Sequence, residues 1–303
     1  MTNLRKTLQQ RRRLAEVGQA YGFLSLYLIG LFAFILWPFG HSIYLAFTNY
    51  RFSPNYDYVG FTNFIRVFTD SLSLKSINVT TRYALVSVPL RLSAALLAAV
   101  VLNTGIRGIG IYRTVYYVPS LIGGGVAVAI MWRRIFGRRG LFNNFIAIFG
   151  LTGQDWIANP DTVRFMLVLL SVWQFGSSML IFLAALKQVP KGLYESAEID
   201  GAGSIRKFFR ITVPLISPVI LFNLVMNIIG AFQVFTQAAV ITGGGPMNET
   251  MFMVLNIYNQ AFRYGNMGYA SALSWTLLVI IAGFTGISFL VSKYWVYYET
   301  SAK

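Results

Sequence analysis

Runs of apolar residues, separated by shorter polar stretches, recur along the whole chain of 303 residues. Six of these runs approach the ~20 residues that an α-helix needs to cross the hydrocarbon core of a bilayer. They predict membrane spans over residues 21–47, 80–103, 112–132, 163–186, 213–235 and 269–291. Tyr112, Trp132 and Trp295 lie near the ends of such runs, where aromatic rings suit the headgroup region. The pattern therefore indicates an all-α polytopic membrane protein.

The composition of the chain agrees with this prediction. Charged residues make up 12% of the sequence, whereas soluble domains carry about 25%, and the mean hydropathy is +0.59. A net charge of +15 would suggest nucleic acid in a soluble protein, but basic residues commonly flank the spans of a membrane protein. We therefore expect the lipid bilayer, and no nucleic acid, as the partner of these charges.

The basic residues also predict the orientation, because short loops rich in Lys and Arg stay in the cytoplasm. Five of them precede the first span: Arg5, Lys6, Arg11, Arg12 and Arg13. Six spans then put both termini in the cytoplasm. The same alternation assigns Arg107, Arg113 and the stretch 187–210 to the inside, and the loops 48–79, 133–162 and 236–268 to the outside. One cluster disagrees with the rule, since Arg133, Arg134, Arg138 and Arg139 fall on the outer side.

The sequence offers little catalytic chemistry. His41 is the single histidine, there is no cysteine, and no H-E-x-x-H or G-x-x-x-x-G-K-[ST] motif occurs, so we expect neither a metal site nor a bound nucleotide. Asp and Glu occur only in tails and loops, which disfavours a proton relay through the membrane. Sodium coupling through backbone carbonyls stays open. If the protein moves solutes, its energy is expected to come from a partner.

Neutral polar residues are concentrated in two of the predicted spans. They are Trp173, Gln174, Ser177 and Ser178 in the fourth span, and Asn223, Asn227 and Gln233 in the fifth. An amide that faces lipid is expensive, so these side chains should face protein or a water-filled cavity. Two interpretations remain open: hydrogen bonds between helices, or contacts with a hydroxyl-rich solute such as a sugar.

Arg91 lies in the middle of the second predicted span, whereas Arg82 lies near its end and can snorkel to the surface. A charge at membrane depth usually points inward and is functional. No acidic residue lies in any span, so the partner of Arg91 would be a backbone carbonyl, water, a substrate or another subunit.

A charged stretch interrupts the apolar pattern between the fourth and fifth spans. Residues 195–215 read ESAEIDGAGSIRKFFRITVPL. Two short helices are expected there, because Pro190 suits a helix start and Gly201 and Gly203 allow a sharp turn. Such a helix pair on the cytoplasmic face fits a groove of a soluble partner, although a plain solvated loop would have the same composition.

This stretch resembles the EAA loop of ABC importer permeases, whose pattern is E-A-A, three residues, G, nine residues and I-x-L-P. Matching positions are Glu195, Ala197, Asp200, Gly201, Ala202, Ile211 and Pro214, while Ser196 and Val213 depart mildly from the pattern. Further stretches are similar to the maltose-type carbohydrate permeases: YRTVYYVPSLIGGGVAVAIMW (112–132), FQVFTQAAVITGGGP (232–246) and GYASALSW (268–275).

The resemblance implies a six-helix type I ABC importer (MetI-like) fold in a bacterial-type cytoplasmic (inner) membrane. It divides the chain into an N-terminal tail, first span and first external loop (1–76), a transmembrane core (77–295) that includes the coupling loop 190–214, and a short cytoplasmic tail (296–303). The implied partners are a second homologous permease, two ATPase subunits that carry ATP and Mg, and an extracellular solute-binding protein. The chain itself would be a permease subunit without enzymatic activity or cofactor, and the substrate a sugar or oligosaccharide.

By position, the resemblance also implies the substrate contacts Trp173, Gln174, Ser177, Asn227, Gly230, Ala231 and Val234. The four arginines at 133–139 suit an anionic solute such as a uronic-acid oligosaccharide, an acidic binding protein, or lipid headgroups. Three other functions stay open: a glycerol-3-phosphate permease within the same class, an ion-coupled secondary carrier or channel, and a membrane-embedded enzyme.

Overall fold

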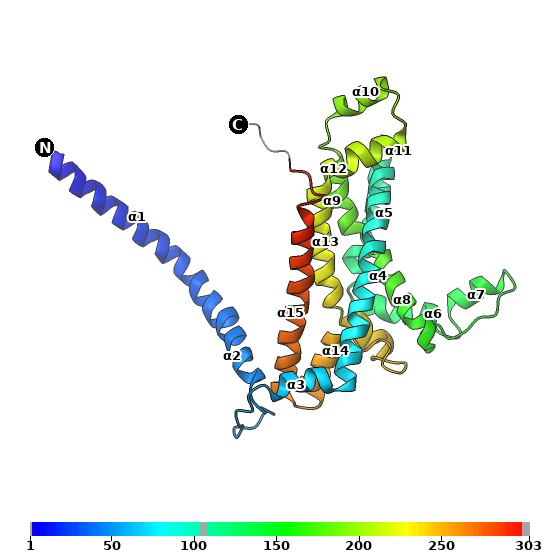
Figure 1. Cartoon of the computed structure of the whole chain (residues 1–303), viewed down its shortest axis with the longest axis horizontal. Coiled ribbons are helices and arrows are strands. Elements are labelled where there is room, and N and C mark those ends of the chain that lie inside the picture. Colours follow the sequence, from blue (N-terminus) through cyan, green and yellow to red (C-terminus); the bar gives the residue numbers. More distant parts are fainter. Residues whose placement is uncertain (1, 104–107, 299–303) are drawn as a thin grey trace.

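The computed structural model describes residues 2–103 and 108–298 (Figure 1). Every element in these ranges is helical, which confirms the all-α prediction. The α-helices are α1 (Thr2–Leu31), α2 (Trp37–Ala46), α3 (Thr62–Thr69), α4 (Ser71–Leu102), α5 (Ile109–Ile122), α6 (Val126–Phe136), α7 (Leu141–Ala147), α8 (Pro160–Trp173), α9 (Gly176–Leu186), α10 (Lys191–Ile199), α11 (Ser204–Lys207), α12 (Val213–Leu215), α13 (Ser217–Phe232), α14 (Met253–Tyr258) and α15 (Met267–Ser292). Short π-helical turns are η1 (Phe32–Leu36), η2 (Phe208–Thr212), η3 (Ala238–Thr242) and η4 (Asn259–Arg263). Arg107 and residues 299–303, which the orientation and tail predictions include, lie outside the described residues.

Three of the six predicted spans are continuous helices. Among the described residues, the segments Glu16–Ala46, Ser71–Leu102 and Met267–Ser292 are long and apolar enough to cross a membrane. Helix α4 begins nine residues before the predicted 80, because the Asp70 side chain accepts a hydrogen bond from the Ser73 N–H and caps its first turn.

The other three predicted spans are bent helix pairs. The α8–α9 pair bends by 41°, the pair formed by Ser204–Leu215 and α13 bends by 69°, and α5 meets the segment Val126–Ala147 at 99°. The prediction of one helix over 112–132 is therefore wrong. The chain turns at Gly123 to Gly125, where an added Cβ on Gly123 would overlap the Gln174 side chain, and α6 and α7 project sideways from the bundle (Figure 1).

Helix α4 lies at the centre of the bundle, where it packs against α8, α9 and α13. These helices enclose the main hydrophobic core, which includes the fully buried Phe182, Phe232 and Phe252. A smaller cluster joins α2, α3 and α15 through Ala46, Val67 and Leu273. Most of the apolar stretch of the first span is uncovered in this chain, whereas its C-terminal end packs on α15 and buries Leu45 and Ala46.

The two ends of the bundle carry different elements. Figure 1 places the N-terminal end of α1, the α10–α11 segment and the C-terminal end of α15 toward one end of the molecule, and α3 and α14 at the other. We call these the α10 end and the α3 end. The alternation of six spans predicts this distribution of the segments.

Candidate functional site

The charged stretch at the α10 end forms the helix pair that the sequence predicts. Helix α10 ends at Ile199, and the chain turns at Gly201, whose φ of +73° lies in the left-handed region that glycine adopts without strain. The Ala202 N–H donates to the Ala197 carbonyl at 2.8 Å, and the Gly201 N–H donates to the Glu198 carbonyl at 3.0 Å. These two bonds form a Schellman motif, whose turn position favours the glycine found at residue 201.

Two side-chain contacts brace this helix pair. Lys207 donates to Glu198 at 2.5 Å between α11 and α10, and the hydroxyls of Tyr194 and Thr212 lie 2.8 Å apart. Apolar side chains on the pair stay uncovered in this chain, with Ile199 88% exposed and Ile205 77% exposed. A rigid, charged element with exposed apolar residues is suited to docking against another protein.

A cavity of about 270 Å³ lies within the bundle. Helices α4, α8 and α13 line it, together with the segment 233–237 that follows α13. Its volume lies near the lower end of the ~300–1,000 Å³ typical of small-molecule pockets. Amide, hydroxyl and guanidinium groups from different helices converge on the space, so it is suited to a polar solute.

Gln174 connects this cavity to two helix breaks. It lies at the break between α8 and α9, and its side chain donates to the Gly123 carbonyl at 3.0 Å, at the break between α5 and α6. Its own carbonyl, left free by the break, accepts from Arg91 at 2.7 Å and from Ser120 at 2.8 Å. The two breaks are therefore joined by hydrogen bonds at the cavity wall.

Close packing reinforces this connection. A Cβ on Gly176 would overlap the Tyr116 carbonyl and would lie 2.7 Å from the Tyr117 Cα atom, so α9 and α5 meet backbone to backbone. A Cβ added to Gly123 would likewise overlap the Gln174 side chain, so no larger residue fits at this position. Small residues allow this close approach between helices.

The structure places most of the predicted substrate contacts together. Gln174, Asn227, Gly230, Ala231 and Val234 line the cavity. The amide of Asn227 donates to Ser178 at 3.0 Å and to the Asn223 carbonyl at 2.8 Å, so it also joins α13 to α9 as an interhelical bond.

Two predicted contacts lie outside the cavity lining. The ring of Trp173 packs on Trp132, with centroids 5.9 Å apart. Ser177 is exposed, and its backbone N–H donates to Ser120 at 3.1 Å.

Helix α4 adds a further part of the cavity wall, of which the sequence predicted the inward-pointing Arg91 but not Tyr83 or Ser87. Tyr83, Ser87 and Arg91 all line the cavity, and they are four residues apart. This spacing puts them on one face of a helix, so a polar stripe at i, i+4 and i+8 within an apolar run was the available signal.

The four arginines at 133–139 surround a groove of about 700 Å³ between α6, the start of the α6–α7 connection and Val240 of η3. All four residues are exposed, and none forms a salt bridge within residues 2–103 and 108–298. An open groove with four unpaired cations attracts anions.

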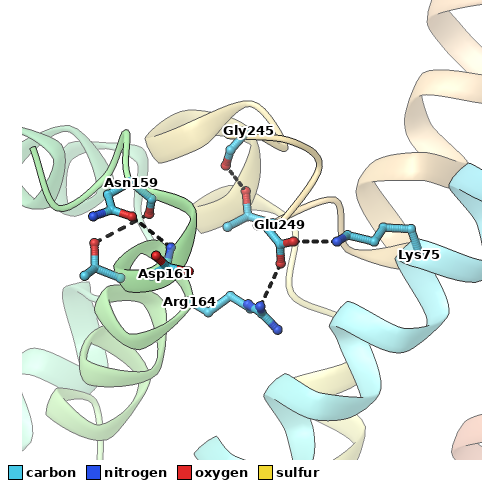
Figure 2. A network of polar contacts seen from close by, with 8 residues as sticks. Lys75, Asn159, Asp161, Arg164, Gly245 and Glu249 are labelled. Carbon is cyan, nitrogen blue, oxygen red and sulfur yellow. Dashed lines mark hydrogen bonds and ion pairs between the residues drawn. The ribbon is translucent and has the colours of Figure 1, made fainter.

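An ion-pair hub lies near the α3 end. Figure 2 shows Lys75 of α4 and Arg164 of α8 reaching the two oxygens of the Glu249 carboxylate from different helices. The Glu249 carboxylate lies 2.5 Å from Lys75 Nζ and 2.9 Å from Arg164 Nη2, and its side chain is only 14% exposed. The loop 243–252 is thereby attached to two helices of the bundle. Within the described residues, no group of His, Cys, Asp or Glu side chains could hold a metal ion.

Comparisons with known proteins agree over most of the chain. Residues 92–297 match the family model described as binding-protein-dependent transport system inner membrane component. The probable ABC transporter permease protein YesP of Bacillus subtilis is 47% identical over 284 residues, which are 92% of each chain. The sn-glycerol-3-phosphate transport system permease protein UgpA of Yersinia enterocolitica is 35% identical over 260 residues, covering 84% of this chain and 88% of UgpA.

The fold is also similar to a solved structure. A chain of the bacterial alginate ABC transporter, in complex with an alginate pentasaccharide-bound periplasmic protein, superposes with a TM-score of 0.82. It is 20% identical and the match covers 93% of this chain and 96% of that one. The shared fold includes nearly the whole chain.

Proposed function

We propose the following function for this chain, which belongs to the family of binding-protein-dependent transport system inner membrane components. It is the transmembrane permease subunit of an ABC importer and not itself an enzyme. In the proposed mechanism, the bundle exposes its cavity to either side of the membrane in turn. A separate, ATP-hydrolysing partner supplies the free energy.

The helix pair of residues 190–214 is proposed to be the docking element for that ATPase. The supporting observation is the Schellman turn at Gly201 with its two braces, because a rigid element transmits motion while a flexible loop absorbs it. Glu195 and Asp200 are exposed on this element, beside apolar residues that the chain leaves uncovered. Two copies of the ATPase and a second permease subunit complete the proposed assembly.

The cavity is the proposed solute site, and a sugar or oligosaccharide is the proposed solute. Gln174 and Asn227 offer amide groups, and Tyr83 and Ser171 offer hydroxyls, which suit the hydroxyl groups of a sugar. Gly230, Ala231 and Val234 form a wall without polar side chains, suited to the apolar face of a ring. The named solutes of two relatives, a glycerol phosphate and an alginate pentasaccharide, are in keeping with a hydroxyl-rich substrate.

The α10 end is proposed to face the cytoplasm of a bacterial-type cell, and the α3 end to face outward. The basic N-terminal segment supports this orientation. Solute would then arrive at the α3 end from an extracellular or periplasmic binding protein. A ligand shifts a conformational equilibrium only by its different affinities for the two states, so binding protein and ATP must each favour one state.

Reconstitution of the assembled importer tests this function. Proteoliposomes that contain both permeases, the ATPase and the binding protein should accumulate radiolabelled oligosaccharide only when ATP is present, and leaving out any one component should abolish uptake. Uptake by this chain alone in response to a sodium gradient would refute the proposal in favour of a secondary carrier.

The docking element is tested in the same system. Glu195→Lys should reduce ATPase co-purification and ATP-driven uptake, because it reverses a charge on the exposed face of the helix pair. Lys191→Arg serves as the matched control, since it keeps the charge at another exposed position of α10. Full ATPase binding by the Glu195 variant would contradict the assignment of this surface.

A further inference from the structure

Arg91 is the one charged residue among those that line the cavity. Its guanidinium reaches the wall from the middle of α4, beside the amide of Gln174. Because Arg stays protonated at every physiological pH, the space inside the bundle carries a fixed positive charge.

The hydrogen bonds of this guanidinium are incomplete. Arg91 Nη2 donates to the Gln174 carbonyl at 2.7 Å, while its buried Nε donates to no group within the described residues. A guanidinium has five N–H donors in a planar fork that matches a carboxylate. The described residues also hold no salt bridge to Arg91. A charge removed from water without an acidic partner is expensive, so a bound anion would stabilise this site.

The arginine groove and the cavity are lined by neighbouring residues on two segments of the chain. Gly124, two residues before α6, lines the cavity, and Ile130 of α6 lines the groove. Gln237 lines the cavity, and Val240, three residues later, lines the groove. Positive charge therefore lies in both spaces, on four exposed arginines in the groove and on Arg91 in the cavity.

We propose that the solute carries a carboxylate and that Arg91 binds it, so that this importer takes acidic oligosaccharides built from uronic-acid units. This inference rests on the proposed function and names its substrate class. Charge balance selects a carboxylate over a phosphate ester, because a phosphate group carries about −1.5 to −2 at pH 7 and the cavity lining supplies a single cation. The arginine groove increases the local concentration of the acidic solute and its rate of entry.

Matched pairs of probes test the charge directly. The assembled importer in proteoliposomes is offered trigalacturonate, trimannuronate and triglucuronate, each beside its methyl ester, which keeps the ring and removes the charge. Wild-type protein should transport at least one free acid about tenfold or more better than its ester, as expected for a charge-assisted hydrogen bond. Preference for the esters, for neutral sugars or for a sugar phosphate would overturn the proposal.

The role of Arg91 in binding the carboxylate is tested by Arg91→Gln. This variant keeps an amide donor for the Gln174 carbonyl but removes the charge. The ratio of acid to ester transport should fall by about tenfold or more, whereas a purely structural role would lower both rates together and leave the ratio unchanged. Arg82→Gln, on an exposed part of the same helix, is the control and should keep the wild-type ratio.

The two levels of failure are distinguishable. Transport of neutral but not acidic sugars leaves the proposed function intact and refutes the carboxylate site. Absence of transport for every sugar, with an ATPase that remains active in the complex, counts against the proposed function itself. If the Arg91 variant does not assemble, the wild-type preference between acid and ester still decides the substrate class.

Discussion

Glu249 shows how much the function of a single residue depends on its neighbours. The sequence places it in a polar loop, where it resembles any solvated acid. In the structure, Lys75 and Arg164 reach it from two helices that are remote in the sequence (Figure 2). Nothing in a local pattern brings residues 75, 164 and 249 together, so the hub could not be predicted from the sequence.

We expect Glu249→Gln to lower the free energy of unfolding by about 1 kcal/mol, because two cations lose their partner while both remain more than a third exposed. In a chain of this size such a loss should lower the melting temperature by about 2–4 °C. Scanning fluorimetry of the purified protein in detergent measures it.

Glu198→Gln is the control for this prediction. It breaks a pair with the same 2.5 Å separation, but the Glu198 side chain is 64% exposed, so the change should stay below about 0.5 kcal/mol. Equal shifts for the two variants would show that burial of the hub contributes nothing.

At the scale of elements, the hydrophobic pattern predicted where helices lie but not where they bend. The 269–291 prediction agrees closely with α15 (Met267–Ser292), because an uninterrupted apolar run of this length favours one continuous helix. The 112–132 prediction failed because the 99° turn depends on contacts with another helix, above all the bond from Gln174 to the Gly123 carbonyl. The signal in the sequence, three adjacent glycines, is equally compatible with close packing in a straight helix.

The turn between α10 and α11 leads to a prediction at this scale. Gly201→Ala places a Cβ on a residue with φ of +73°, which strains the turn by about 1–2 kcal/mol. If docking requires this turn, association with the ATPase should weaken by about 5- to 30-fold. Co-purification and ATP-driven uptake measure the effect.

Gly192→Ala is the matched control for the turn. Gly192 lies in α10, the helix that precedes the turn, without a positive φ and with no atom within 4 Å of an added Cβ. Alanine favours a helix by up to about 1 kcal/mol over glycine, so docking should be retained. Equal loss of ATPase in both variants would point to a general effect of side-chain bulk.

For the molecule as a whole, the decisive measurement is which side of the membrane each end faces. The arginines at 133–139 depart from the positive-inside rule, so the orientation needs a direct test. The natural chain has no cysteine, so a single introduced cysteine reports its own location. Arg139→Cys should react with a membrane-impermeant maleimide in intact cells. Ser204→Cys, at the α10 end, should react only in inside-out vesicles prepared without the ATPase. The reverse pattern would invert the proposed orientation.

The cavity has two walls of different character, and this asymmetry bears on how such a protein adapts. On one side, Gln174 and Arg91 hold the helix breaks in place, so a substitution there disturbs the architecture as well as the binding. On the other side, Gly230 has no atom within 4 Å of an added Cβ. Mutations at Gly230 can therefore change the preferred solute while the hydrogen bonds that hold the helix breaks stay in place.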